Sequence, residues 1–79
     1  YPNPFNPSTT IKFNLATAGF ATLKLYDVLG KEVASMLSSE LDAGPHQVSF
    51  DASNLPSGTY FYTLTSGSFT ETRKMMFLK

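Results

Sequence analysis

Cysteine is absent from this 79-residue chain, which excludes disulfide bonds and thiolate metal sites. No run of about 20 apolar residues is present, so a membrane-spanning helix is excluded as well. Six basic and six acidic side chains balance, and the chain therefore lacks the positive charge that binds nucleic acid or an anionic membrane. What remains is a small domain held together by its apolar core alone. Its margin of stability is thin, because such a chain buries only about 60% of its unfolded surface.

An export signal is also missing from the first residues, which contain neither a basic segment nor an apolar one. If the protein leaves the cytoplasm, we expect that signal to lie upstream. We therefore expect residues 1–79 to form a single domain at the C-terminal end of a longer protein.

Glycines separate the apolar runs at spacings typical of the turns of an all-β domain. The alternation of apolar and polar residues predicts strands at 9–15, 20–26, 31–37, 46–51, 59–65 and 69–78, with a short extended piece at 4–5. Residues 32–37 could instead form a short helix, although so short a helix is marginal. About seven strands predict a small immunoglobulin-like antiparallel β-sandwich, since two packed sheets protect their edges better than one open sheet.

The same alternation predicts which side chains face the core. Leu55, in the loop at 52–58, is expected to fold under the sandwich. The side chains expected on the inner faces of the strands are Ile11, Phe13, Leu15, Ala21, Leu23, Leu25, Val33, Ser35, Leu37, Val48 and Phe50.

Three residues are expected to fix the backbone at turns. Asp27 favours the start of a type I turn, and Gly30 can supply the positive φ of the bulge residue that closes a hairpin. Gly58, before the strand at 59–65, is expected to need a backbone conformation that a side chain would oppose.

A nucleophilic triad is the first chemistry to test, since the chain contains His46, Ser49 and Asp51 close together. His46 and Asp51 lie five residues apart on one expected strand, so their side chains point to opposite faces. No glycine-framed nucleophile elbow accompanies them. We therefore expect His46 to be a lone strand-end histidine among solvent-facing polar residues, and the domain not to be an enzyme.

Calcium would need closely spaced carboxylates, and the candidates Asp27, Glu32, Glu40 and Asp42 do not form such a ladder. We expect no metal and no cofactor.

Three successive aromatics, Tyr60-Phe61-Tyr62, could form a stacking platform for sugars or bases. On a strand they must alternate between faces, so core packing of two of them is the simpler interpretation.

The last eight residues bracket an apolar tetrad with basic side chains: TRKMMFLK. One interpretation is a final sandwich strand whose charges prevent edge aggregation. The other is a linear signal that a partner reads, because a terminal strand can peel away or add to another sheet. The residues that we expect a partner to recognise are Lys74, Met75, Phe77, Leu78 and Lys79.

Four motifs together resemble the type A C-terminal sorting domains of the type IX (Por) secretion system of the Bacteroidetes. They are the opening run YPNPFNPSTTI, the hairpin YDVLGKEV, the strand LPSGTYFY and the basic-apolar close formed by Lys74, Met75 and Lys79. The resemblance spans the whole chain in order. It implies an immunoglobulin-like sandwich, similar also to the module of flagellar hook-capping proteins.

The resemblance further implies a secretion signal, not an enzyme. Such a domain carries an N-terminal cargo from the periplasm through an outer-membrane translocon to the cell surface or the medium. A surface sortase-like peptidase commonly removes it, and no nucleic acid or membrane insertion is involved. Two alternatives stay open: a carbohydrate-binding or fibronectin-like accessory module, which predicts exposed coplanar aromatics, and a hook-cap-like module that assembles with itself.

Overall fold

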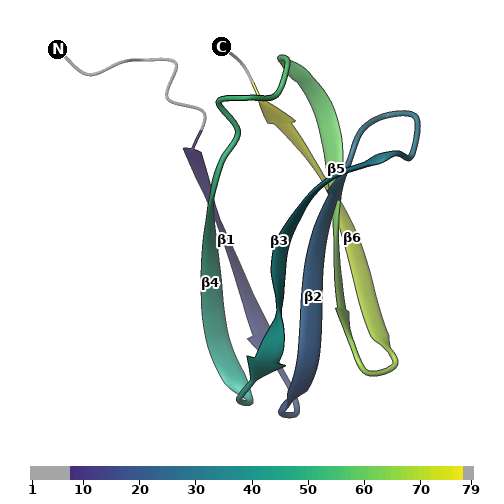
Figure 1. Cartoon of the computed structure of the whole chain (residues 1–79). Helices are drawn as coiled ribbons and strands as arrows, with labels where there is room; N and C mark the ends of the chain where they lie inside the picture. Colours follow the sequence, from purple (N-terminus) through teal and green to yellow (C-terminus); the bar gives the residue numbers. More distant parts are fainter. Residues whose placement is uncertain (1–7, 78–79) are drawn as a thin grey trace, which may run out of the picture.

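The computed structural model describes residues 8–77, and these fold into two antiparallel sheets that pack face to face (Figure 1). One sheet pairs β1 with β4, and the other has the order β3-β2-β5-β6. The strands are β1 (Ser8–Leu15), β2 (Gly19–Tyr26), β3 (Glu32–Leu41), β4 (Gly44–Asp51), β5 (Gly58–Ser66) and β6 (Phe69–Phe77).

This architecture confirms the expected all-β sandwich, with six strands in residues 8–77 where about seven were expected. The extended piece expected at 4–5 lies outside the described residues. Residues 32–37 belong to strand β3, so the alternative of a short helix there is wrong. Within the described part of the chain there is also no helix that could cross a membrane.

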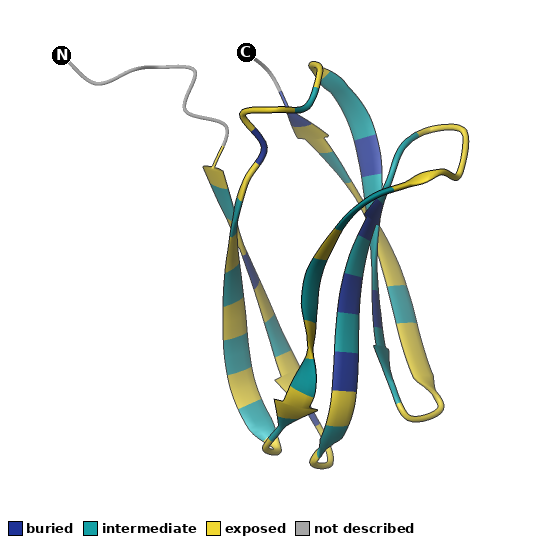
Figure 2. Ribbon diagram, in the orientation of Figure 1, coloured by how far each residue is buried: buried dark blue, intermediate teal, exposed yellow. Residues whose placement is uncertain are grey.

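Two clusters of apolar side chains fill the space between the sheets. Along β2 every second residue is buried, which places Leu23 and Leu25 at the centre with no exposed surface (Figure 2). Full burial of a leucine side chain contributes roughly 1.5–3 kcal/mol to folding. The buried members of the clusters are Leu25, Ala52, Tyr60 and Phe77 in one, and Ile11, Leu23 and Leu64 in the other.

Strand β3 departs from simple alternation because it bulges twice against β2. Leu23 pairs with Leu37 but Lys24 pairs with Ser35, so Met36 is an extra residue on β3. Each bulge shifts the phase of the side chains that follow it. The prediction that Ser35 faces the core is therefore wrong: Ser35 is exposed, and Met36 packs against both core clusters instead.

The loop between β4 and β5 closes one end of the sandwich. Leu55 is half-buried there and packs against the first cluster, which confirms the expectation that it folds under the sandwich. Its backbone N–H donates to the carbonyl of Ala52 at 2.9 Å. The Tyr60 hydroxyl donates to the carbonyl of Pro56 at 2.7 Å and so joins the loop to the core.

Candidate functional site

The last described strand, β6, forms one edge of the four-stranded sheet (Figure 1). It pairs with β5 along its whole length, from Phe69 opposite Ser66 to Phe77 opposite Gly58. Within residues 8–77 no strand pairs with its other side. That side presents backbone N–H and C=O groups to which a strand of another molecule could pair.

The residues expected to be recognised divide between the two faces of β6. Lys74 lies opposite Phe61 and is exposed on the outer face. Met75 lies opposite Tyr60 and packs against both core clusters. Phe77 is buried, and its ring centroid lies 5.2 Å from that of Tyr60 and 6.3 Å from that of Phe50. Leu78 and Lys79 lie outside the described residues.

Met76 is an exposed apolar residue that the sequence reasoning did not single out. It is 59% exposed and lies opposite Thr59 on the same face as Lys74. The alternation of a strand could have identified it, because residues 74 and 76 must share a face. The outer surface near the end of β6 therefore combines a positive charge with a flexible apolar side chain.

An ion pair on the inner face of β6 was also missed. Glu71 lies opposite the buried Leu64, and Arg73 lies opposite Tyr62, so both side chains point towards the other sheet. Arg73 donates to Glu71 Oε2 from Nη2 at 2.7 Å and from Nε at 3.0 Å. The hydrogen bond and the negative charge of Glu71 raise the pKa of Arg73 above its ordinary value.

This ion pair borders a hollow of about 290 Å³ between the two sheets. Its apolar walls include Ile11, Leu23 and Leu64, and β1 contributes the opposite rim. Both charged side chains keep access to solvent, since Arg73 is 62% exposed and Glu71 is 41% exposed, which explains why they are tolerated on an inner face.

The turn from β2 to β3 is built around Asp27. The Asp27 carbonyl accepts from Gly30 N–H at 3.0 Å, and Asp27 N–H donates to the Lys31 carbonyl at 2.9 Å. Its carboxylate oxygen Oδ1 accepts from the N–H groups of Leu29 at 2.9 Å and Lys31 at 3.0 Å. Gly30 has φ +85°, which suits the bulge residue of such a hairpin.

Gly58 also has a positive φ, +156°, a backbone conformation that residues with a side chain rarely adopt. A Cβ built there would have Tyr60 Cε1 as its nearest neighbour, at 4.0 Å. The requirement for glycine is therefore set by backbone conformation and not by lack of space.

His46, Ser49 and Asp51 do not come together. Ser49 lies 3.4 Å from Thr10 between hydroxyl oxygens, and Asp51 accepts from the backbone N–H of Ser53 at 2.9 Å. Both are exposed, whereas His46 is half-buried on the other face of β4. The geometry agrees with the expectation that these residues form no triad.

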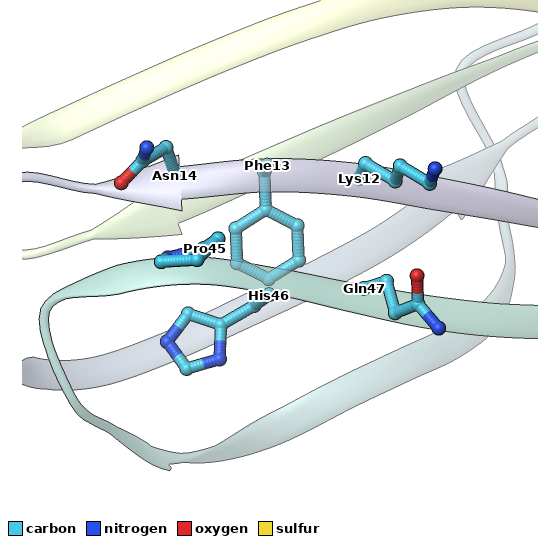
Figure 3. Close-up of a pocket in the computed structure, with 6 residues that line it drawn as sticks. All are labelled: Lys12, Phe13, Asn14, Pro45, His46 and Gln47. Carbon is cyan, nitrogen blue, oxygen red and sulfur yellow. The ribbon is translucent and has the colours of Figure 1, made fainter.

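The expected surroundings of His46 are nevertheless wrong. His46 shares the inner face of β4 with Val48 and Phe50, and its ring stacks on Phe13 with 5.7 Å between centroids. Figure 3 shows the two side chains beside each other, in a shallow hollow of about 530 Å³. His46 Nε2–H donates to the carbonyl of Asp42 at 2.6 Å, because a carbonyl can only accept. The imidazole thus serves packing and a turn.

The three successive aromatics of β5 do alternate. Tyr60 is buried, and Tyr62 packs against both core clusters, whereas Phe61 faces outwards between Tyr26 and Lys74. Core packing of two of them is confirmed. The strand has no exposed coplanar strip of three rings, which the carbohydrate-binding alternative requires.

The carboxylates are engaged separately. Asp27 holds its turn, and Glu32 Oε1 lies 3.7 Å from Lys24 Nζ on the outer face. Among residues 8–77 no group of three or more potential metal ligands comes together.

Comparison with known protein families adds a match along the chain. The model of the secretion system C-terminal sorting domain matches residues 1–78. No curated protein and no solved structure matches the chain. The match agrees with the motifs of the sequence and with the all-β fold.

A sorting domain of this kind carries the C-terminal signal for type IX secretion. It implies a type IX secretion system, a cargo region on its N-terminal side and export through the outer membrane to the cell surface or the medium. Since the match covers residues 1–78 of the 79, the chain belongs to the family of secretion system C-terminal sorting domains.

Proposed function

We propose that residues 1–79 form a single non-catalytic domain that targets its cargo to the outer-membrane translocon of the type IX system. Translocon components recognise the folded sandwich together with its last strand. The residues on which this recognition depends are Lys74, Met75, Phe77, Leu78 and Lys79. A surface sortase-like peptidase then acts on the cargo–domain junction.

The observation that carries this proposal is the edge position of β6. One side of the strand is available for pairing with another molecule, and its outer face presents Lys74 and Met76. Recognition of an edge strand gives affinity through backbone hydrogen bonds and specificity through alternate side chains. Met75 and Phe77 act from the inner face, because their packing holds the strand in the register that a partner reads.

An export assay in a bacterium with the type IX pathway tests the proposal. A fluorescent reporter with an N-terminal Sec signal carries residues 1–79 at its C-terminal end, and a matched reporter lacks them. We expect the first at the cell surface or in the medium and the second in the periplasm. Retention of both in the periplasm would refute the sorting function.

Point variants refine the assay, since truncation before Lys74 would also remove the buried Phe77. Lys74→Glu reverses an exposed charge on β6, and Lys12→Glu makes the same change on the exposed face of β1. Export that falls for Lys74→Glu and persists for Lys12→Glu would place recognition on the last strand.

A further inference from the structure

The tip of the β2–β3 turn exposes two adjacent apolar side chains. Val28 is 65% exposed and Leu29 is 89% exposed, more than the other exposed large apolar side chains Phe20, Phe69 and Met76. A single exposed leucine is ordinary on a protein surface. Two in succession at the end of a protruding hairpin suggest contact with another molecule.

The conformation of the turn does not depend on these two side chains. Asp27 makes four hydrogen bonds within the turn, and Gly30 supplies the positive φ. Polar residues are the usual occupants of such positions and would fit the same backbone. Valine and leucine therefore contribute little to folding here, while the hydrogen bonds hold them in a fixed orientation.

The tip lies at the same end of the domain as the end of β6 (Figures 1 and 2). A row of paired residues crosses the outer face between them, from Tyr26 through Phe61 to Lys74. Both aromatic side chains are half-buried, and the exposed Met76 lies beyond Lys74 on the same face. A partner that binds the last strand can therefore reach the tip across a partly apolar surface.

The charges around the tip indicate the chemistry of that partner. Asp27 and Lys31 flank the two apolar residues with opposite signs, and Lys24 is paired with Glu32 at the base of the hairpin. These charges cancel, whereas segments that bind anionic lipid surfaces carry an excess of lysine and arginine. A rigid, neutral, apolar tip fits a preformed apolar pocket of a protein, where ordering costs are low.

We propose that Val28 and Leu29 form an anchor that inserts into an apolar pocket of the protein that receives this domain during export. This inference rests on the proposed sorting function and gives the receiving protein a second contact, separate from β6. The anchor supplies affinity by burying apolar surface, and β6 supplies orientation.

Three variants of the export reporter test the anchor, two of them double and one single. Val28→Ser/Leu29→Ser makes the tip polar, and Val28→Ile/Leu29→Met keeps it apolar. Phe20→Ser removes a 52% exposed apolar side chain at the start of β2, the end of that strand away from the tip. We expect the polar tip to lower export at least about tenfold, as loss of a buried apolar anchor does. The other two variants should export like the unchanged chain, and all should keep its melting temperature.

The outcomes separate the anchor from the sorting function. If the unchanged chain directs export and the polar tip directs it equally well, the anchor is refuted and the sorting function stands. If the unchanged chain directs no export, both fall. Equal losses for Phe20→Ser and the polar tip, or a melting temperature lowered by the polar tip, would also overturn the anchor.

Vesicles of phosphatidylethanolamine and phosphatidylglycerol test the competing partner. We expect the isolated 79-residue chain not to sediment with them. Sedimentation that the polar tip abolishes would assign the tip to a lipid surface and overturn the protein pocket.

Discussion

Glu71 and Arg73 meet at 2.7 Å on the face of β6 that is turned towards the other sheet. Inward-pointing charges on an edge strand disfavour pairing with a second copy, since the pairing would cover them. The strand can thus keep one side available for a specific partner without associating with itself.

Replacement of this ion pair by apolar residues should make the domain self-associate through the edge strand β6. We expect Glu71→Val/Arg73→Val to form dimers or larger species because the inner face of β6 then resembles an ordinary core strand. Size-exclusion chromatography with light scattering measures the mass. Thr70→Val/Thr72→Val, on the outer face of the same strand, is the control and should stay monomeric. A monomeric Glu71→Val/Arg73→Val variant would contradict this role, and self-association of the unchanged chain would favour the hook-cap-like alternative.

Gly30 should tolerate alanine poorly although there is room for a Cβ. No atom lies within 4 Å of a Cβ built at Gly30, so the cost comes from φ +85° alone. A left-handed backbone costs a non-glycine residue about 1–2 kcal/mol. Urea unfolding should show a loss of that size for Gly30→Ala. Gly19→Ala, at a position with equal space and no positive φ, should be neutral or stabilising, and equal losses at both sites would refute the explanation.

The Tyr60 hydroxyl should contribute to stability through its bond to the Pro56 carbonyl. Tyr60→Phe keeps the buried ring and removes a hydrogen bond worth about 1 kcal/mol. In a domain of this size, that loss lowers the melting temperature by about 4–8 °C. Thermal unfolding followed by circular dichroism measures it. The control is Tyr26→Phe on the outer face, for which we expect little change; an unchanged melting temperature for Tyr60→Phe would mean that water replaces the bond.

Alternation of apolar and polar residues predicted the fold well wherever one face of a strand is buried and the strand itself contains no bulge. Ile11, Leu23 and Leu25 occupy the core as expected, because apolar residues at every second position of a strand must share a face. The turn at Asp27 could be read from local chemistry, since aspartate and glycine have specific backbone roles there.

One error arose where the pairing of two strands, and not the pattern of one strand, decides the outcome. The bulge at Met36 depends on the register of β3 against β2, which no local pattern of β3 reveals. His46 was misplaced although the alternation of its own strand indicates its face. It follows the inward phase of Val48 and Phe50, and Phe13, which it stacks on, comes from a strand more than 30 residues earlier.

The candidate site shows the same division. The sequence identified the last strand by its motif, but it did not separate the residues that hold the strand from those that face a partner. That separation follows from the pairing of Lys74 with Phe61 and of Met75 with Tyr60.

Replacement of Phe77 by alanine should therefore affect different properties of the domain from replacement of Lys74 by alanine. Phe77 is 4% exposed, and loss of a buried phenylalanine costs about 3–5 kcal/mol, a large part of the stability of a small domain. Lys74 is exposed, so its replacement should change stability by no more than about 0.5 kcal/mol.

We thus expect Phe77→Ala to lower both the melting temperature and reporter export, and Lys74→Ala to lower export alone. Phe77→Leu should recover most of both, because it refills much of the cavity. Lys12→Ala is the matched control for the loss of an exposed charge. Normal export with Lys74→Ala would show that the translocon does not read this side chain, and recognition would then depend on the backbone edge of β6 and on the integrity of the fold.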